Sequence, residues 1–413
     1  MTFRTEIAGR HFELRKGLSY KGTNLVDESE VGLLTIDAFI TGGGYKRGAE
    51  KPFDGDYKPE YIAEPGDVLL AMTEQQEGLL ASPLKVPEDL GGMTELIYSL
   101  DVAKVISKSG EISPEFLFNF LRVPLNRRRA SYGDTGTTVQ RLPYDVIYEQ
   151  LIPVPSLEEQ YKINSFIATL DRKIELNTAL ASTLEKIAQS VYRSWFVDFD
   201  PVKAKMSGEK PVGIDDAIAA LFPSSMEDSE AGPIPKGWAK TTIGDVLVKQ
   251  KPGKLFDQKT TRSKGKIPVL DQGRSGVVGY HDDEPGYVAS PENPVVVFAN
   301  HTCSLRFISY PFSVIQNVFP ILGSNISTYW LYFALQGKQN FDSYKGHWPD
   351  LVIKSIVRPS SEIADAFGHV VGPLMKQVWN FERQNRLLAE MRDGLLPRLI
   401  SGELRIPQEM LES

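Results

Sequence analysis

Apolar side chains recur at heptad spacing in two long stretches of the chain. In the first stretch, residues 156–197, the row is formed by Ile163, Leu170, Leu184 and Val191. In the second stretch, residues 360–401, the matching row lies 204 positions later and is formed by Phe367, Leu374, Leu388 and Leu395. Such rows predict two long amphipathic helices, each of which pairs along one face.

Both stretches begin with a helix start signal. Ser156 and Ser360 each follow a proline and can cap the first turn, and Glu159 completes a capping box in the first copy. Roughly 40 helical residues at about 1.5 Å each span about 60 Å, which exceeds the diameter of a small domain. The helices therefore either pair with each other as a coiled coil or lie separately in the cores of their own domains. Asn177 falls in the apolar row, where it either fixes the register or faces solvent at an irregular crossing.

A region with short apolar runs and frequent turn residues precedes each helix. The runs predict strands, and they lie at residues 31–36 and 67–72 in the first half and at 267–270, 294–298 and 312–315 in the second. A short helix is also repeated, at residues 112–120 and 326–334, with Ser113 and Ser327 as its expected caps. The chain therefore has two similar halves, each a β-rich domain followed by a long helix.

Residues 198–235 join the two halves. This segment carries five prolines and several acidic residues, which is typical of a connector, and residues 215–221 are expected to form one or two helical turns. The predicted division is 1–155, first β-rich domain; 156–197, central helix; 198–235, connector; 236–359, second β-rich domain; 360–401, distal helix; and 402–413, C-terminal tail.

Charge is distributed unevenly along the chain. The net charge of −7 is unfavourable for binding nucleic acid, but ten basic residues and three acids lie between Lys236 and Arg274. Residues 127–129 form a second basic cluster. Each cluster marks either a phosphate-binding surface or ordinary solvated charge.

Several classes of site are not expected. Cys303 is the single cysteine and the five histidines are dispersed, so we predict no disulfide and no metal site. The sequence has no apolar run of about 18 residues and no signal peptide, so we expect a cytoplasmic protein without membrane contact.

Motifs for catalysis are also missing. The one glycine cluster, residues 42–44, fits neither a P-loop nor a dinucleotide fingerprint, and no Asn-Pro-Pro-Tyr or Asp-Pro-Pro-Tyr motif of an amino-group DNA methyltransferase is present. We therefore predict a binding protein with no catalytic residue and no cofactor of its own. Its expected DNA contacts are polar and basic side chains on predicted loops: Lys46, Arg47, Gln75, Gln76, Arg127, Arg129, Gln140, Lys251, Lys254, Arg262, Lys264, Gln272, Arg274, His301, Arg306, Lys345 and His347.

Four segments resemble the central and distal regions of specificity (S) subunits of Type I restriction-modification systems. The segments are 151–160 (LIPVPSLEEQ), 171–177 (DRKIELN), 194–201 (SWFVDFDP) and 394–404 (GLLPRLISGEL). Residues 65–69 (PGDVL) and 234–238 (IPKGW) also resemble the strand entry and the domain opening of that family's target recognition domains.

The resemblance implies an α+β fold with an internal pseudo-two-fold repeat. Two target recognition domains would each read one half of a bipartite, asymmetric site in double-stranded DNA, and the two helices would pair as an antiparallel coiled coil that sets the spacer. Two methyltransferase (M) subunits carrying S-adenosylmethionine would dock around the helices and methylate adenine at N6. Restriction (R) subunits, joined through M, would complete an ATP- and Mg-dependent endonuclease complex.

Two other classes of protein are weighed against this interpretation. A freestanding enzyme would carry the catalytic motifs that the sequence lacks. A coiled-coil adaptor without sequence-specific DNA reading would not require two domains with basic loops. The interpretation as a DNA-recognition subunit is therefore preferred.

Overall fold

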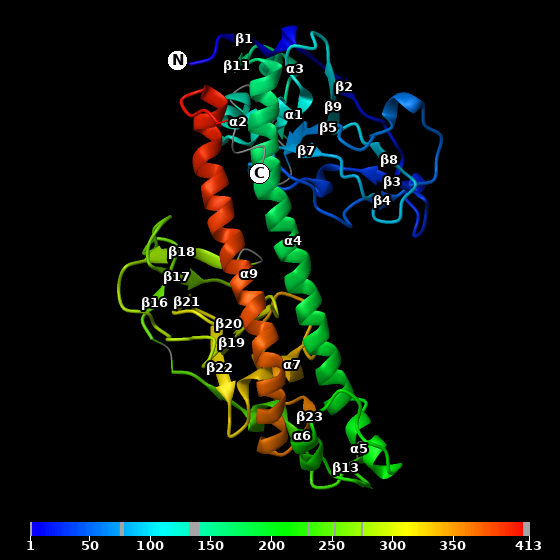
Figure 1. Ribbon diagram of the computed structural model, residues 1–413, viewed down its shortest axis with the longest axis vertical. Helices are drawn as coiled ribbons and strands as arrows, with labels where there is room; N and C mark the ends of the chain where they lie inside the picture. Colours follow the sequence, from blue (N-terminus) through cyan, green and yellow to red (C-terminus); the bar gives the residue numbers. More distant parts are fainter. Residues whose placement is uncertain are drawn as a thin grey trace. The chain divides into compact units, whose positions relative to one another are not determined.

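The computed structural model describes residues 2–74, 78–131, 140–229, 232–251, 253–273 and 276–407. The chain forms two compact units, and each unit contains one β-rich region together with part of both long helices (Figure 1). The first unit comprises Met1–Glu175 and Asn385–Ser413, and the second comprises Leu176–Gln384. The division between the units therefore falls inside both long helices.

The first unit is built from short strands and three short helices that precede the first long helix. The strands are β1 (Thr5–Ile7), β2 (Phe12–Lys16), β3 (Val31–Leu34), β4 (Lys51–Pro52), β5 (Val68–Ala71), β6 (Thr73–Glu74), β7 (Pro83–Lys85), β8 (Glu95–Tyr98), β9 (Val102–Ser107), β10 (Gln140–Arg141) and β11 (Leu151–Pro153). The helices are α1 (Pro114–Arg122), α2 (Pro124–Ser131) and α3 (Tyr144–Tyr148), and the 3-10 turns are η1 (Ala8–Arg10), η2 (Gly22–Asn24), η3 (Ile36–Ala38) and η4 (Pro59–Tyr61). The predicted strands at 31–36 and 67–72 and the predicted helix at 112–120 are confirmed as β3, β5 and α1.

The second unit has a similar composition, and its first elements lie within the connector. Its strands are β12 (Met226–Glu227), β13 (Ile234–Pro235), β14 (Ala239–Thr242), β15 (Leu247–Lys249), β16 (Leu255–Phe256), β17 (Ile267–Leu270), β18 (Val277–His281), β19 (Val295–Ala299), β20 (Leu305–Ile308), β21 (Ser313–Ile315), β22 (Val318–Gly323) and β23 (Ser355–Arg358). Its short helices are α5 (Asp200–Met206), α6 (Asp216–Leu221), α7 (Thr328–Leu335) and α8 (Trp348–Val352), with one 3-10 turn, η5 (Ile243–Val246). The helix expected at 215–221 is confirmed as α6, whose first turn is capped by Asp215.

The sheets show that the two β-rich regions share a topology. One four-stranded antiparallel sheet has the order β2-β9-β5-β7 and its counterpart has the order β15-β22-β19-β20, so both use their strands in the sequence first, last, second, third. A parallel pair also recurs in the second sheet of each region, β3 with β8 and β17 with β21. The internal repeat predicted from the helices therefore extends through the β-rich regions.

Each β-rich region is closed by pairing its first strand with the strand that leads into a long helix. In the first unit β1 pairs antiparallel with β11, and in the second unit β14 pairs antiparallel with β23. The strand that precedes each long helix is therefore fixed to the start of its own domain. This arrangement sets where each helix leaves the domain.

The two long helices are α4 (Leu157–Phe196) and α9 (Ser361–Ser401). The hydroxyl of Ser156 accepts a hydrogen bond from the Glu159 backbone at 3.3 Å, and that of Ser360 accepts one from the Ile363 backbone at 3.4 Å, as the start signals predict. α9 is continuous through the Gly-Pro pair at 372–373. Within each unit, the early part of one helix packs with the late part of the other, so α4 and α9 pair antiparallel (Figure 1).

The largest hydrophobic cluster of each unit includes side chains from α4 and α9. In the first unit, Ile163 and Ile167 of α4 share a core with Leu396, Leu399 and Ile400 of α9 and with the apolar faces of β5, β9 and α1. In the second unit, the core combines the end of α4 with the start of α9 and α7. The prediction that the helices pair with each other is confirmed, because neither helix is buried alone.

Polar side chains dock α1 onto α4 in the first unit. The amide of buried Asn119 donates to Asn164 at 2.9 Å, and Gln160 accepts from the Ser113 backbone at 2.9 Å. Ser113 also caps α1, since its hydroxyl accepts a hydrogen bond from the Phe116 backbone at 3.1 Å. These amides satisfy one another in a site that excludes water, so they fix the position of α1 more narrowly than apolar contact alone.

Aromatic rings dock α7 in the second unit. Phe333 of α7 lies edge-on to Phe367 of α9 at 5.6 Å between ring centroids, and Phe367 lies edge-on to Phe196 of α4 at 5.3 Å. The predicted cap by Ser327 is wrong, because its side chain makes no capping hydrogen bond. Its hydroxyl instead lies against Gly368, where an added Cβ would come within 2.8 Å. Close packing on α9 thus replaces the cap in the second copy.

Asp171 of α4 lies between two arginines in the first unit. It accepts hydrogen bonds from Arg122 of the α1 segment at 2.6 and 2.9 Å and from Arg392 of α9 at 2.9 Å. Burial alone would raise the pKa of Asp171, but the hydrogen bonds and charges of Arg122 and Arg392 outweigh burial and hold the pKa below its ordinary value. One carboxylate therefore ties three helices together.

We expect Asp171→Asn to lower the free energy of unfolding by about 2 kcal/mol at pH 7, because it removes charge-assisted hydrogen bonds. A lowered folded-state pKa contributes stability above the ordinary carboxyl pKa of about 3.9, and this contribution is lost as the pH falls through the folded-state value. Urea unfolding from pH 7 to pH 3 should therefore show the gap between wild type and variant closing in acid. The exposed neighbour Glu175 serves as the control through Glu175→Gln. A gap that stays constant with pH would indicate lost packing instead.

Candidate DNA-contacting surfaces and helix pairing

Seven basic side chains are exposed on the segment that runs from the end of β15 to the start of β17. They are Lys249, Lys251, Lys254, Lys259, Arg262, Lys264 and Lys266. An Asx turn shapes the segment, since the Asp257 carboxylate accepts hydrogen bonds from the backbone of Lys259 at 2.9 Å and of Thr260 at 2.8 Å. We call residues 249–266 the basic segment, and it includes four of the predicted DNA contacts.

Acidic neighbours on the loop after β18 contact the basic segment without neutralising it. Lys254 pairs with Asp283 at 2.6 Å, and Arg262 pairs with Asp282 at 3.3 Å. The hydrogen bond from Lys254 lowers the pKa of Asp283. All four side chains are about half exposed or more, so these ion pairs contribute little to stability and can exchange for other anions.

Three further predicted contacts meet at one place in the second unit. The Nδ1 of His301, in the turn after β19, lies 2.8 Å from the Lys345 carbonyl oxygen. The side chain of Gln272 accepts a hydrogen bond from the His301 backbone at 2.9 Å. Lys345 forms ion pairs with Asp342 at 3.3 Å and Asp350 at 3.0 Å. Residues that are far apart in sequence thus form one polar cluster.

Two predicted contacts have their side chains turned inward. His347 is fully buried, and its Nε2 lies 3.0 Å from the Ser343 carbonyl oxygen. Arg306 donates to the carbonyl oxygens of Gly276 and Asp271, and burial lowers its pKa. These side chains hold loops in place and present little surface of their own.

The predicted contacts of the first unit divide in the same way. Lys46 is exposed, and Arg47 is exposed while paired with Asp89 at 3.0 Å. Arg127 is half-buried, and it donates to three backbone carbonyls, including that of Gly42 at 3.2 Å. Gly42 has a φ of +93°, which L side chains rarely adopt, so the glycine cluster serves a backbone turn that Arg127 braces.

The remaining predicted contacts fall where the structure gives no side-chain description. Gln75, Gln76 and Arg274 lie outside the described residues, and so do the side chains of Arg129 and Gln140. Only the sequence therefore supports their predicted role in DNA contact.

The predicted heptad rows line the interior of the helix pair to different depths. Ile163 and Phe367 are buried. The other members are half-buried: Leu170, Leu184, Val191, Leu374, Leu388 and Leu395. The rows are most deeply buried where a β-rich region also packs on the helices.

A polar pair lies within the helix pairing of the second unit. Asn177 is fully buried, and its amide donates to the side-chain oxygen of Gln384 at 3.2 Å. Of the two alternatives for Asn177, the one in which it faces solvent is therefore wrong. A buried amide pair inside an apolar seam favours the one register in which the two amides meet.

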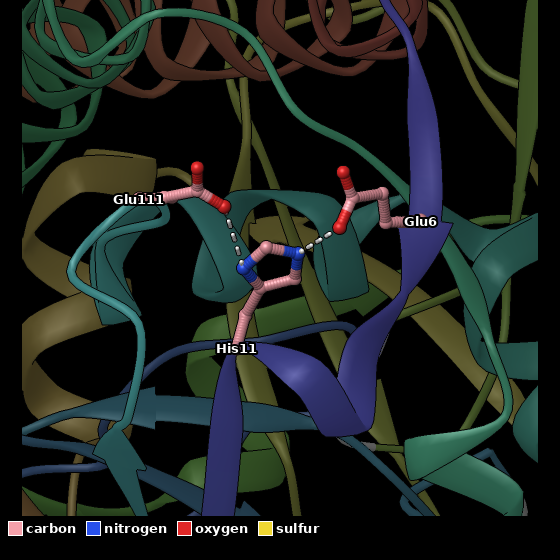
Figure 2. Close-up of side chains that lie close together, drawn as sticks. All are labelled: Glu6, His11 and Glu111. Atoms are coloured by element: carbon pink, nitrogen blue, oxygen red, sulfur yellow. Dashed lines mark ion pairs between the residues drawn. The ribbon is translucent and has the colours of Figure 1, made fainter.

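A cluster of one histidine and two glutamates lies near the N-terminus, as Figure 2 shows. The Nε2 of buried His11 is 3.2 Å from Glu6, and its Nδ1 is 3.7 Å from Glu111. The two ring nitrogens thus face opposite carboxylates, and one ion cannot use both. Arg4 lies 3.4 Å from Glu6 and 3.3 Å from Glu111, so the positive charge that these carboxylates require is already supplied. We interpret the cluster as an anchor for β1.

Comparison with known proteins identifies the class of this architecture. The family model for the Type I restriction modification DNA specificity domain matches residues 52–186. The MjaIX specificity subunit of Methanocaldococcus jannaschii is 27% identical over 328 residues, covering 74% of this chain and 72% of the relative. The HindI specificity subunit of Haemophilus influenzae is 27% identical over 362 residues, covering 71% and 78%. The S subunit of a Type I system from M. genitalium shares the fold, with a TM-score of 0.53, 15% identity and 96% of both chains covered.

These matches place the chain next to proteins named as DNA specificity subunits of Type I restriction enzymes. Residues 52–186 match the Type I restriction modification DNA specificity domain, and the chain is similar over about three quarters of its length to specificity subunits of Type I restriction enzymes. Among the helices that the structure describes, none is both long and apolar enough to cross a membrane.

Sequence reasoning missed the residues that dock the short helices onto the long ones. Asp171 lies next to Leu170 of the apolar row, and Asn164 lies next to Ile163. A polar residue beside a buried row position is the signal that could have indicated a docking contact, because it lies at the edge of the seam.

The Asn177–Gln384 pair can be tested by a double-mutant cycle. We expect Asn177→Leu or Gln384→Leu alone to lower the free energy of unfolding by about 1–2 kcal/mol, because each leaves the partner amide buried and unpaired. The double variant should regain most of that loss, with a coupling energy of about 1 kcal/mol in urea unfolding. Strictly additive losses would show that the amide pair makes no specific contribution.

Proposed function

We propose that this chain reads a bipartite, asymmetric sequence in double-stranded DNA, with each β-rich region recognising one half. The observation that carries this proposal is that the same sheet topology occurs twice, each time packed on its own portion of one helix pair. Two reading domains of different sequence on a common support are what a two-part asymmetric target requires.

The basic segment supports DNA contact in the second unit. Its exposed lysines and Arg262 can replace condensed counterions on phosphates, while Gln272, His301 and Lys345 lie together in a second polar cluster of the same unit. In the first unit the exposed candidates are Lys46 and Arg47. Phosphate contacts would position each domain, and amide side chains would read base edges in the groove.

The helix pair would set the distance between the two half-sites. Each helix of about 40 residues is about 60 Å long, and helices paired along their length resist bending more than a single helix. A fixed support predicts a fixed number of base pairs between the two halves of the target.

Partner subunits would supply the chemistry. We expect two methyltransferase subunits, each carrying S-adenosylmethionine, to dock on the helix pair and methylate adenine at N6 in the cytoplasm. Restriction subunits would join through them and bring the ATP and Mg²⁺ requirement. An exposed apolar stripe on α4 supports docking, since Leu176, Leu180 and Ile187 are 53%, 48% and 45% exposed on one helix face.

A coiled-coil adaptor without sequence-specific DNA reading is the alternative function. Such a protein would use the helix pair alone. The duplicated sheets and the exposed basic segment favour the reading function over the adaptor.

Exchange of one domain tests the two-part reading. The chain is expressed with a methyltransferase subunit encoded beside it, and adenine methylation is mapped across the host genome. Residues 236–359 are then exchanged for the corresponding domain of a relative. We expect a two-part methylated motif in which the exchange alters one half and leaves the other half and the spacer unchanged. Absent methylation, or a change in both halves of the motif, would contradict the proposal that the two β-rich regions read DNA independently.

Docking on the α4 stripe is tested by Leu180→Asp. This variant places a charge in the apolar stripe, so we expect at least a tenfold loss of methyltransferase co-purification with little change in the melting temperature of the chain itself. Ser182→Asp is the matched control, because it adds the same charge on the opposite side of the helix, about 200° away. Equal co-purification of both variants would place the docking surface elsewhere.

A further inference from the structure

The loop between α7 and α8 exposes two aromatic rings. Tyr344 is 85% exposed and Phe341 is 57% exposed. Aromatic side chains usually bury most of their surface, and their exposure on one short loop marks a surface that contacts another molecule.

Hydrogen bonds hold this loop in one conformation. The buried ring of His347 lies with Nε2 3.0 Å from the Ser343 carbonyl oxygen and with Nδ1 3.2 Å from the Gln339 amide. Asn300 accepts from the His347 backbone at 2.9 Å and from the Trp348 backbone at 2.8 Å. Tyr344 is thus presented to solvent by a braced loop, which reduces the entropy lost on binding.

Tyr344 already forms the outer layer of a ring stack. It lies nearly parallel to His301, with an interplanar angle of 13° and 5.1 Å between ring centroids. His301 is itself held by the Lys345 carbonyl and by Gln272. Because 85% of Tyr344 is exposed, the face opposite His301 is open to a third flat ring.

The charge around the loop favours a nucleobase over a phosphate as this third ring. Lys345, the cation beside Tyr344, forms ion pairs with Asp342 and Asp350. The loop therefore offers a stacking surface with little net charge, while the basic segment provides the cations. Gln272, two residues after β17, contacts the turn that carries His301 and Thr302.

We propose that Tyr344, backed by His301, inserts at a base step of the DNA half-site read by the second unit and stacks on an unstacked nucleobase. Aromatic and apolar wedges of this kind open and kink duplex DNA, and one aromatic–base stack contributes enough energy to offset part of the unstacking. The inference rests on the proposed DNA-reading function and assigns to Tyr344 a positioning role within it. An opened step also suits an enzyme whose partner acts on a base outside the helix.

The test uses the full chain in complex with its methyltransferase subunit and duplexes of the methylated target determined by genome mapping. The fluorescent base 2-aminopurine, which is quenched by stacking, replaces one base at a time through both half-sites. We expect a fluorescence increase on binding at one step of the half-site assigned to residues 236–359, from the base that loses its neighbour without stacking on Tyr344. The methylated adenines, which the partner takes out of the helix, are left unlabelled, and the other positions of the second half-site are the internal control.

Variants at position 344 separate the ring from the hydroxyl. Tyr344→Leu should abolish the fluorescence increase and weaken binding to the target about tenfold, whereas Tyr344→Phe should change affinity by less than about twofold. The ring is exposed, so both variants should keep the wild-type melting temperature. Wild-type binding without any fluorescence increase, or equal behaviour of the leucine and phenylalanine variants, would overturn the stacking role alone. Absence of a methylated motif in the wild type would instead reject the DNA-reading function.

Discussion

The antiparallel pairing of α4 and α9 is the contact on which the rest of this structure depends. Each compact unit closes its core with side chains from both helices, Ile163 with Leu396 in one and Phe196 with Phe367 in the other. The largest core cluster of each unit therefore includes the helix that follows the other β-rich region, while smaller clusters lie within the β-rich regions alone. The chain joins its two halves by sharing these two helices.

The two copies of the short docking helix show how a repeat can diverge while the architecture stays the same. α1 is fixed by amide hydrogen bonds and by Arg122 on Asp171, whereas α7 is fixed by a cluster of aromatic rings. Hydrogen-bonded networks depend on geometry and charge, and aromatic clusters depend on buried area. The stability of the two units should therefore respond differently to pH. The β-rich regions can vary in sequence as long as one of these two ways of docking the short helix is kept.

Much of this fold could be predicted from the sequence, and the reasons are local. The heptad rows, the capping serines at 156 and 360 and the alternation of apolar runs with turns depend on near neighbours, and they predicted α4, α9 and the main strands. The DNA-contacting residues were harder to predict, because the exposure of a side chain depends on tertiary packing. Arg127, Arg306 and His347 have the residue types of DNA contacts, yet their side chains brace the backbone. The predicted Ser327 cap is wrong for the same reason, because close packing against Gly368 of α9 overrides the local preference of serine for the cap position.

The division between bracing and exposed polar side chains has a consequence for specificity. Arg306 and His347 hold the loops that carry Gln272, Lys345 and Tyr344, and the loops then present those side chains in fixed positions. A loop that is ordered before it meets DNA loses less entropy on binding and rejects a mismatched base more strongly. A change in target sequence would therefore be reached most easily by substitution of the presented residues, while the bracing residues and the shared helix pair stay as they are.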